Sequence, residues 1–98
     1  MKVRFLSPAH EEIAHSALYY LQASPQAAFD FEEEIERAVF EITQNPTMYK
    51  VDKPSGHRVK QLDKFPFSLY YRIENDEIQI ISAAHHARLP GYWHGRLK

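Results

Sequence analysis

The chain has 98 residues, of which 44% are hydrophobic and 26% charged, a balance typical of one globular domain spanning residues 1–98. It has no cysteine, which excludes disulfides, thiolate metal sites and a cysteine nucleophile, and no apolar run approaches the roughly 18 residues of a membrane-spanning helix. Because the N-terminus lacks the apolar run of a signal peptide, we expect a cytoplasmic protein with no membrane contact.

The net charge of −1 is divided unevenly along the chain. Residues 1–49 carry three Lys or Arg against eight Asp or Glu, whereas residues 50–98 carry nine against five. A basic C-terminal half beside an acidic N-terminal half favours an anionic partner on one side of the molecule. Solvated helix faces and scattered surface lysines explain the same distribution equally well.

The N-terminal segment predicts a short strand and then a helix. Residues 2–6 alternate in polarity, which is typical of a strand. The Ser7-Pro8 pair predicts a helix start with Ser7 as N-cap, and it places Glu11 and Glu12 near the positive end of the helix dipole. Side chains at helical spacing predict the buried stripe of this helix, which ends near residue 22 or 23: Ile13, Ala17, Tyr20 and Leu21.

A second helix is predicted from Pro25 to about Gln44, because Ser24-Pro25 repeats the start signal and Asn45-Pro46 ends it. Two helices joined by about two residues form an antiparallel hairpin. The expected inward face is apolar: Ala28, Phe31, Ile35, Ala38, Val39 and Ile42. The other face is acidic, and it is either simply solvated or a docking surface: Asp30, Glu32, Glu33, Glu34 and Glu36.

Three strands are predicted in the second half, at residues 57–62, 67–73 and 77–85, after an irregular loop at 46–56. We expect Arg58 and Lys60 on the outer face of the first strand, beside the Ser68, Tyr70 and Arg72 face of the second. The predicted fold is α+β with the order β-α-α-β-β-β. An antiparallel helical hairpin packs on one face of a small, mainly antiparallel four-stranded sheet.

Basic and aromatic side chains gather at the end of the last strand and in the residues after it. Arginine neutralises phosphate, aromatic rings stack on bases, and a histidine or tyrosine can transfer a proton. The candidate catalytic residues, if the protein is a ribonuclease, are His86, Arg88 and Tyr92. The candidate nucleic-acid-binding or target-binding residues are Arg58, Lys60, Arg72, His85, Trp93 and Arg96.

The same residues also have a purely structural interpretation. His85 can be a core histidine, Tyr92 and Trp93 can close the end of the sheet as an apolar plug, and Arg88 can pair with a carboxylate. His85 and His86 are neighbours on a strand and point to opposite faces, so we expect no shared metal site. No nucleotide-binding motif is present, and we expect no cofactor.

The ordered set of motifs resembles the RelE/ParE superfamily of toxins from type II toxin–antitoxin systems. The resemblance covers the whole chain and rests on short blocks of sequence: Ser7-Pro8-Ala9, Tyr19-Tyr20, Gly56-His57-Arg58-Val59, Phe65-Pro66-Phe67, Tyr70-Tyr71-Arg72, His85, Arg88, Pro90, Tyr92-Trp93 and Arg96. It implies a small toxin that a cognate antitoxin, encoded in a neighbouring open reading frame, binds in a hetero-oligomer.

The resemblance implies two alternative targets. ParE-like members inhibit DNA gyrase, whereas RelE-like members cut mRNA on the ribosome with basic and acid–base residues of the sheet and tail. Ser68 stands where RelE-like members place an arginine, and this favours the ParE side, hence a gyrase poison with no chemistry of its own. An endoribonuclease and a degenerate module that only binds antitoxin remain the alternatives.

Overall fold

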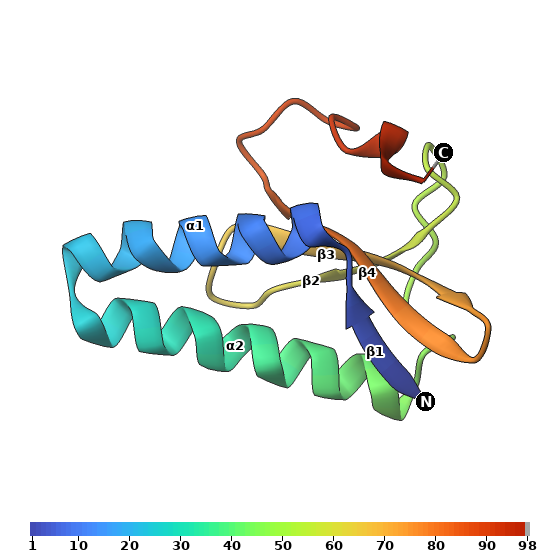
Figure 1. Ribbon diagram of the computed structural model, residues 1–98, viewed down its shortest axis with the longest axis horizontal. Coiled ribbons are helices and arrows are strands. Elements are labelled where there is room, and N and C mark those ends of the chain that lie inside the picture. The colour runs from blue at the N-terminus through green and yellow to red at the C-terminus, as the bar shows by residue number, and fades with distance from the viewer. Residues whose placement is uncertain (98) are drawn as a thin grey trace.

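The computed structural model describes residues 1–97, and its elements follow the predicted order (Figure 1). They are β1 (Lys2–Phe5), α1 (Ser7–Ala23), α2 (Pro25–Gln44), β2 (Arg58–Gln61), β3 (Phe67–Glu74), β4 (Glu77–His85) and a short 3₁₀ turn, η1 (His94–Arg96). The β-α-α-β-β-β prediction is confirmed, and the bounds of α2 match those expected from its Ser-Pro start and Asn-Pro end.

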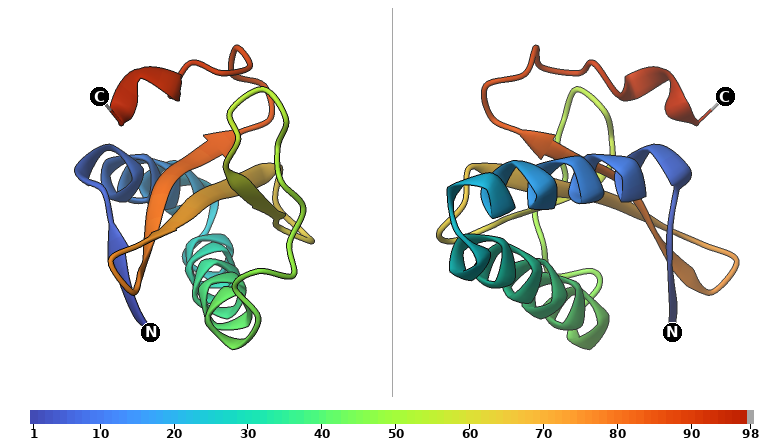
Figure 2. Two further views of the ribbon diagram at one scale, coloured as in Figure 1. Left: turned by 90° about the vertical axis from the view of Figure 1, so that its right-hand side faces the viewer. Right: turned by 60° about the vertical axis from the view of Figure 1, so that its left-hand side comes forward.

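The four strands form one sheet in the order β1-β4-β3-β2. β1 runs parallel to β4, and the other two pairs are antiparallel. The helical hairpin covers one face of the sheet, and the segment after β4 runs back on the side away from α2 (Figures 1 and 2). Asn75 and Asp76 connect β3 to β4 with φ of 52° and 58°, as a two-residue hairpin turn requires.

The main core lies between the hairpin and the sheet and is rich in aromatic rings. The Phe31 ring lies 5.1 Å from Tyr20, 5.3 Å from Phe65 and 5.1 Å from Phe67, measured between centroids. Tyr71 is fully buried, and its hydroxyl donates to the Pro46 carbonyl at 2.6 Å. Phe31 therefore joins both helices and the sheet in one cluster.

Some predicted details of the helices are wrong. Ser7 is the first helical residue and not the N-cap, because the cap is Leu6 and no side chain bonds there. Leu21 is 49% exposed, since a turn of 100° per residue carries it away from its inward neighbour Tyr20. Ser24 is confirmed as a cap, and its Oγ accepts from the Ala27 amide at 3.0 Å.

The acidic face of α2 also differs from the prediction at one position. Glu34 is only 4% exposed, and its carboxylate accepts from the Lys64 amide at 2.9 Å. The other acidic residues of the run are exposed. Glu34 therefore holds the turn between β2 and β3 against α2, a tertiary contact that local charge patterning does not reveal.

β4 contains a bulge that its continuous apolar sequence does not reveal. Tyr70 pairs with Ser82 and Tyr71 pairs with Ile80, so Ile81 is the extra residue. Ile80 packs in the main core, whereas Ile81 joins a second cluster on the opposite face. The continuous apolar run of β4 thus reflects burial on both faces, as predicted, together with a break in the strict alternation.

Candidate functional site

Residues 86–97, here called the tail, form a second small core over the sheet. Trp93 is 3% exposed and stacks on Tyr70 at 4.4 Å between centroids. Ile81 and Ala84 of β4 complete this cluster. The environment of Trp93 therefore matches the interpretation of this residue as an apolar plug. Because the ring is buried, little of its surface is accessible to a binding partner.

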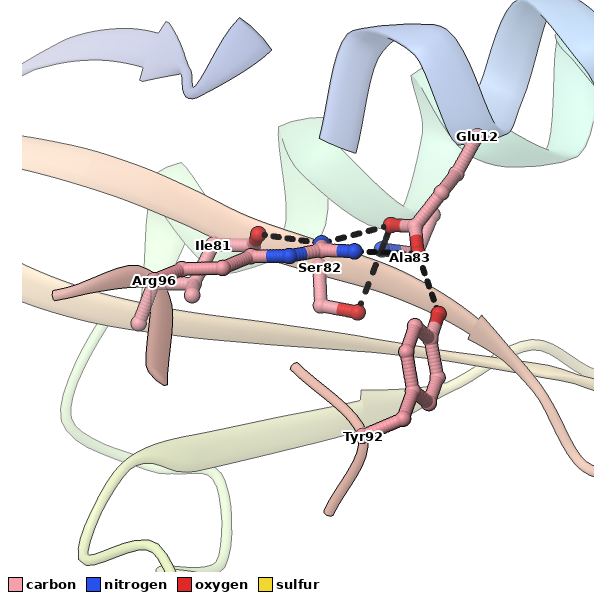
Figure 3. Close-up of polar contacts among 6 residues, drawn as sticks. All are labelled: Glu12, Ile81, Ser82, Ala83, Tyr92 and Arg96. Carbon is pink, nitrogen blue, oxygen red and sulfur yellow. Dashed lines mark hydrogen bonds and ion pairs between the residues drawn. The ribbon is translucent and has the colours of Figure 1, made fainter. Parts of the chain in front are cut away.

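The tail is also held by a charged contact with α1. The Glu12 carboxylate accepts two bonds from the Arg96 guanidinium, at 2.9 Å on Oε1 and 2.8 Å on Oε2 (Figure 3). The Tyr92 hydroxyl donates to the same carboxylate. The Ala83 amide donates to Oε1 at 3.0 Å, and Arg96 also donates to the Ile81 carbonyl at 3.1 Å. Glu12 and Arg96 thus satisfy backbone groups of β4 beyond Ile80, the last residue of this strand that pairs with β1.

The electrostatics of this network fix the protonation state of each member. Burial acts to raise the pKa of Glu12, but hydrogen bonds from Arg96, Tyr92 and the Ala83 amide outweigh it and leave that pKa below the usual 4.5. Burial, followed by the bond to Glu12, raises the pKa of Tyr92 above its usual value. Tyr92 therefore stays a protonated donor at neutral pH and is a poor proton acceptor.

A pocket of about 280 Å³, here called the tail pocket, opens between the tail and the strands. Ser68 and His86 meet in it and share a hydrogen bond of 2.9 Å between Oγ and Nε2. The Arg88 guanidinium carbon lies 3.8 Å from the Tyr92 ring centroid, in cation–π geometry. Of the residues that the structure describes, no Asp or Glu lines the pocket, so a negatively charged group that entered would meet cationic and neutral side chains.

The structure separates the two adjacent histidines, as their strand spacing predicts. The His85 ring packs edge-on against Phe67 at 4.9 Å on the helix side, and its Nδ1 accepts from the Ala87 amide at 2.9 Å. His86 is exposed and lies at the tail pocket. Both histidines border the tail pocket, but the His85 ring is packed on Phe67, so His86 is the better placed of the two to meet a ligand there together with Arg88.

Arg58 and Lys60 do not lie on the expected outer face. In the β2–β3 register they pair with Tyr71 and Leu69, which face the helices. Arg58 donates to the Tyr49 carbonyl at 2.7 Å, and the Lys60 ammonium lies 3.4 Å from the Glu41 carboxylate of α2. The prediction was wrong because the alternation of β2 was counted without its partner strand.

Arg72 lies on the tail side of the sheet, as expected, but its guanidinium is already engaged. It donates to the Gln79 side chain at 2.8 Å and pairs with the Glu74 carboxylate at 3.1 Å. Within residues 1–97, the structure therefore brings five predicted residues together around the tail pocket: His85, His86, Arg88, Tyr92 and Trp93.

Glu12 is the site residue that sequence reasoning missed. It lies three residues after Ala9, which is fully buried, and one before Ile13, so helical spacing places it at the edge of the inward stripe. That position is the signal that could have identified it. Among residues 1–97, no three His, Asp or Glu side chains lie close enough to hold a metal ion, and neither helix is long and apolar enough to cross a membrane.

Comparisons with known proteins agree with the fold. A solved structure described as the chromosomal ParDE TA system from P. aeruginosa has a TM-score of 0.76 at 23% identity, covering 87% of this chain and 95% of that one. No curated protein sequence matches. A family model described as the ParE toxin of type II toxin-antitoxin system, parDE, matches residues 3–90, which ends just before Gly91. Because the match spans most of the chain, the protein belongs to the ParE toxin family of type II toxin–antitoxin systems.

Proposed function

We propose that the protein inhibits growth by binding and poisoning DNA gyrase, and that it does so without cleaving RNA. The observation that carries this proposal is the engagement of Tyr92 and Arg96 by Glu12. Cleavage of RNA needs a proton acceptor near the 2′-hydroxyl and cations on the scissile phosphate. Tyr92 has a raised pKa and the positive charge of Arg96 is balanced by Glu12, so we expect neither to supply these functions.

The placement of the remaining cations supports the same proposal. Arg58 and Lys60 face the helices, and Arg72 is paired with Glu74. Within residues 1–97, Arg88 is the one arginine that lines the tail pocket, beside His86. This set offers one cation and one imidazole for phosphate cleavage, whereas a toxin that acts by binding needs only a surface.

The experiment is a side-by-side assay of the purified protein on gyrase supercoiling and on ribosome-bound mRNA. We expect supercoiling to be blocked at micromolar protein while the mRNA stays intact. The His86→Ala variant, which removes the exposed imidazole of the tail pocket, should inhibit gyrase as the wild type does. Unaffected gyrase at micromolar protein would overturn the proposal.

A ribosome-dependent endoribonuclease is the second candidate, favoured by the Ser68–His86 hydrogen bond beside Arg88. In that mechanism His86 transfers the proton and Arg88 holds the phosphate. mRNA cleavage by the wild type that His86→Ala abolishes would establish this candidate in place of the first. Normal growth on expression without antitoxin would instead favour a module that only binds antitoxin.

The partner in this proposal is an antitoxin encoded by a neighbouring small open reading frame. Family membership supports it, because the family model describes the toxin of a type II toxin–antitoxin system. Co-expression of the two frames should yield a hetero-oligomer that co-purifies and no longer inhibits gyrase. If the neighbouring product fails to co-purify, this part of the proposal falls.

A further inference from the structure

A separate pocket, of about 290 Å³, opens on the helix side of the sheet, between α1, the start of β3 and the end of β4. We call it the helix-side pocket. Its volume is near the lower limit of small-molecule sites, roughly 300 Å³. The lining residues come from three elements: His15, Ser16, Tyr19 and Tyr20 of α1, Phe67 of β3 and His85 of β4.

The aromatic walls of the helix-side pocket are fixed by the main core. The Tyr20 ring lies 5.1 Å from Phe31 and 5.0 Å from Phe65, measured between centroids. The Phe67 ring lies 5.1 Å from Phe31. Tyr19 meets Tyr20 edge-on at 5.5 Å and is itself 71% exposed. Because the inner rings are already ordered, a flat ligand would pack on them with little loss of side-chain freedom.

The His85 imidazole offers a hydrogen-bond donor at the border of this pocket. Its Nδ1 accepts from the Ala87 amide at 2.9 Å, so the neutral ring carries its proton on Nε2. Within residues 1–97, Nε2 bonds no other group, and no buried side-chain nitrogen or oxygen lacks a partner. The Nε2–H group is therefore open to solvent and free to donate to a ligand.

The chemistry of the lining favours an uncharged ligand over an ion. A histidine that binds a metal ion presents a lone pair to it and usually donates from its other nitrogen, whereas His85 accepts on Nδ1 and donates from Nε2. Of the lining residues that the structure describes, none is Lys, Arg, Asp or Glu. A charged ligand would therefore lose hydration without meeting a permanent opposite charge.

We propose that the helix-side pocket binds a small, uncharged, planar aromatic molecule whose carbonyl oxygen accepts from the Nε2–H group of His85. The ligand ring packs against Tyr19, Tyr20 and Phe67. His85 also borders the tail pocket, and its Nδ1 holds the Ala87 amide at the start of the tail. The ligand therefore acts on a side chain that both sides of the sheet share. This proposal is independent of the gyrase target.

The test is an NMR titration of the backbone amides of the full chain with acetophenone, an uncharged aromatic ketone. We expect a Kd of about 5 mM or tighter, as suits so small a molecule, and a shift of the Ala87 amide resonance. Benzoate, which has the ring with a charge, and cyclohexanone, which has the carbonyl without an aromatic ring, should each bind at least about threefold more weakly. A Kd for acetophenone above about 5 mM, or tighter binding of benzoate, would overturn the proposal.

Two variants place the probe in this pocket. His85→Phe keeps a ring against Phe67 but removes the donor, and it should weaken acetophenone binding about three- to tenfold. His86→Phe, the matched change in the tail pocket, should alter the Kd by less than about twofold. Equal losses in these two variants would assign the probe to the tail pocket and overturn the proposal.

Tyr19→Ala tests the outer wall without disturbing the core, because this ring is exposed. It should weaken acetophenone binding by about threefold or more. Leu18→Ala, its exposed neighbour outside the pocket, is the matched control and should leave the Kd unchanged. If Tyr19→Ala binds acetophenone as the control does, the ligand does not lie against α1 and the proposal falls.

Discussion

The two faces of the sheet hold their covering segments by different kinds of contact. On the helix side, Phe31 packs among Tyr20, Phe65 and Phe67, and the contacts are spread over two helices and the sheet. On the tail side, a smaller apolar cluster around Trp93 is supplemented by one carboxylate, Glu12. The helix side therefore depends on distributed apolar burial, whereas the tail side depends on a charged contact that a single change can break.

The largest effect is expected on the helix side. Phe31→Ala should lower the free energy of unfolding by about 3–5 kcal/mol, because it empties the centre of the aromatic cluster. Chemical denaturation gives this value directly. Phe29→Ala, two residues earlier on the exposed face, should cost less than about 0.5 kcal/mol. Similar losses for the two variants would show that the cluster is not what holds the hairpin.

Glu12→Gln should have the next largest effect, at about 2 kcal/mol. It leaves the half-buried Arg96 without a counter-charge, and its cost stays below that of a fully buried pair because solvent still reaches both partners. Hydrogen exchange of the backbone amides of residues 92–96 should accelerate while exchange in α2 is unchanged. Glu11→Gln, the exposed neighbour, is the control. Unchanged exchange in the tail would contradict the comparison of the two faces.

Acid should weaken the tail side before the helix side. The pKa of Glu12 is lowered on folding, so its contribution is complete above the unfolded value near 4.5 and is lost as the pH falls through the lower folded value. The stability difference between the wild type and Glu12→Gln should therefore shrink as the pH falls below about 4.5. Urea titrations over a pH series measure it. A difference that stays constant in acid would contradict the assignment to Glu12.

Gly91→Ala should cost about 1–2 kcal/mol, because φ is +77° and the new Cβ would lie 2.8 Å from His94 Cε1. Gly56→Ala meets a similar φ of +76° with no atom within 4 Å. The difference between the two variants isolates the contact with the His94 ring, and thermal unfolding measures it. Equal costs would show that backbone conformation alone decides the cost at Gly91.

Local signals in the sequence were sufficient for the elements and for their order. Ser24-Pro25 and Asn45-Pro46 fix both ends of α2, and helical spacing selects Phe31 and Ile42 for the core. Helix ends and core positions depend on residues that are close in the chain, so they can be predicted from a single sequence. The confirmed fold class follows from them, because so short a connection between helices and two short turns between strands allow few topologies.

The site depended on register and on distant contacts, which local patterns do not contain. The faces of Arg58 and Lys60 were wrongly predicted, because pairing with β3 decides them. The contact between Glu12 and Arg96 joins residues 84 positions apart, and an isolated Glu on a helix gives no sign of its partner. The gathering of basic and aromatic side chains led to the tail, and only the three-dimensional arrangement showed which of them are already engaged.

The bulge at Ile81 has a consequence for changes in chain length. Strict alternation from Ile78 and Ile80 would turn residue 86 toward the helices and residue 85 toward the tail. The extra residue reverses this, so His85 contacts Phe67 and His86 contacts Ser68. Inserting one more residue after Ala83 would exchange the two histidines between the faces, with no change in composition around them. In this strand, a one-residue insertion would therefore change which side chains face the tail pocket without replacing any residue.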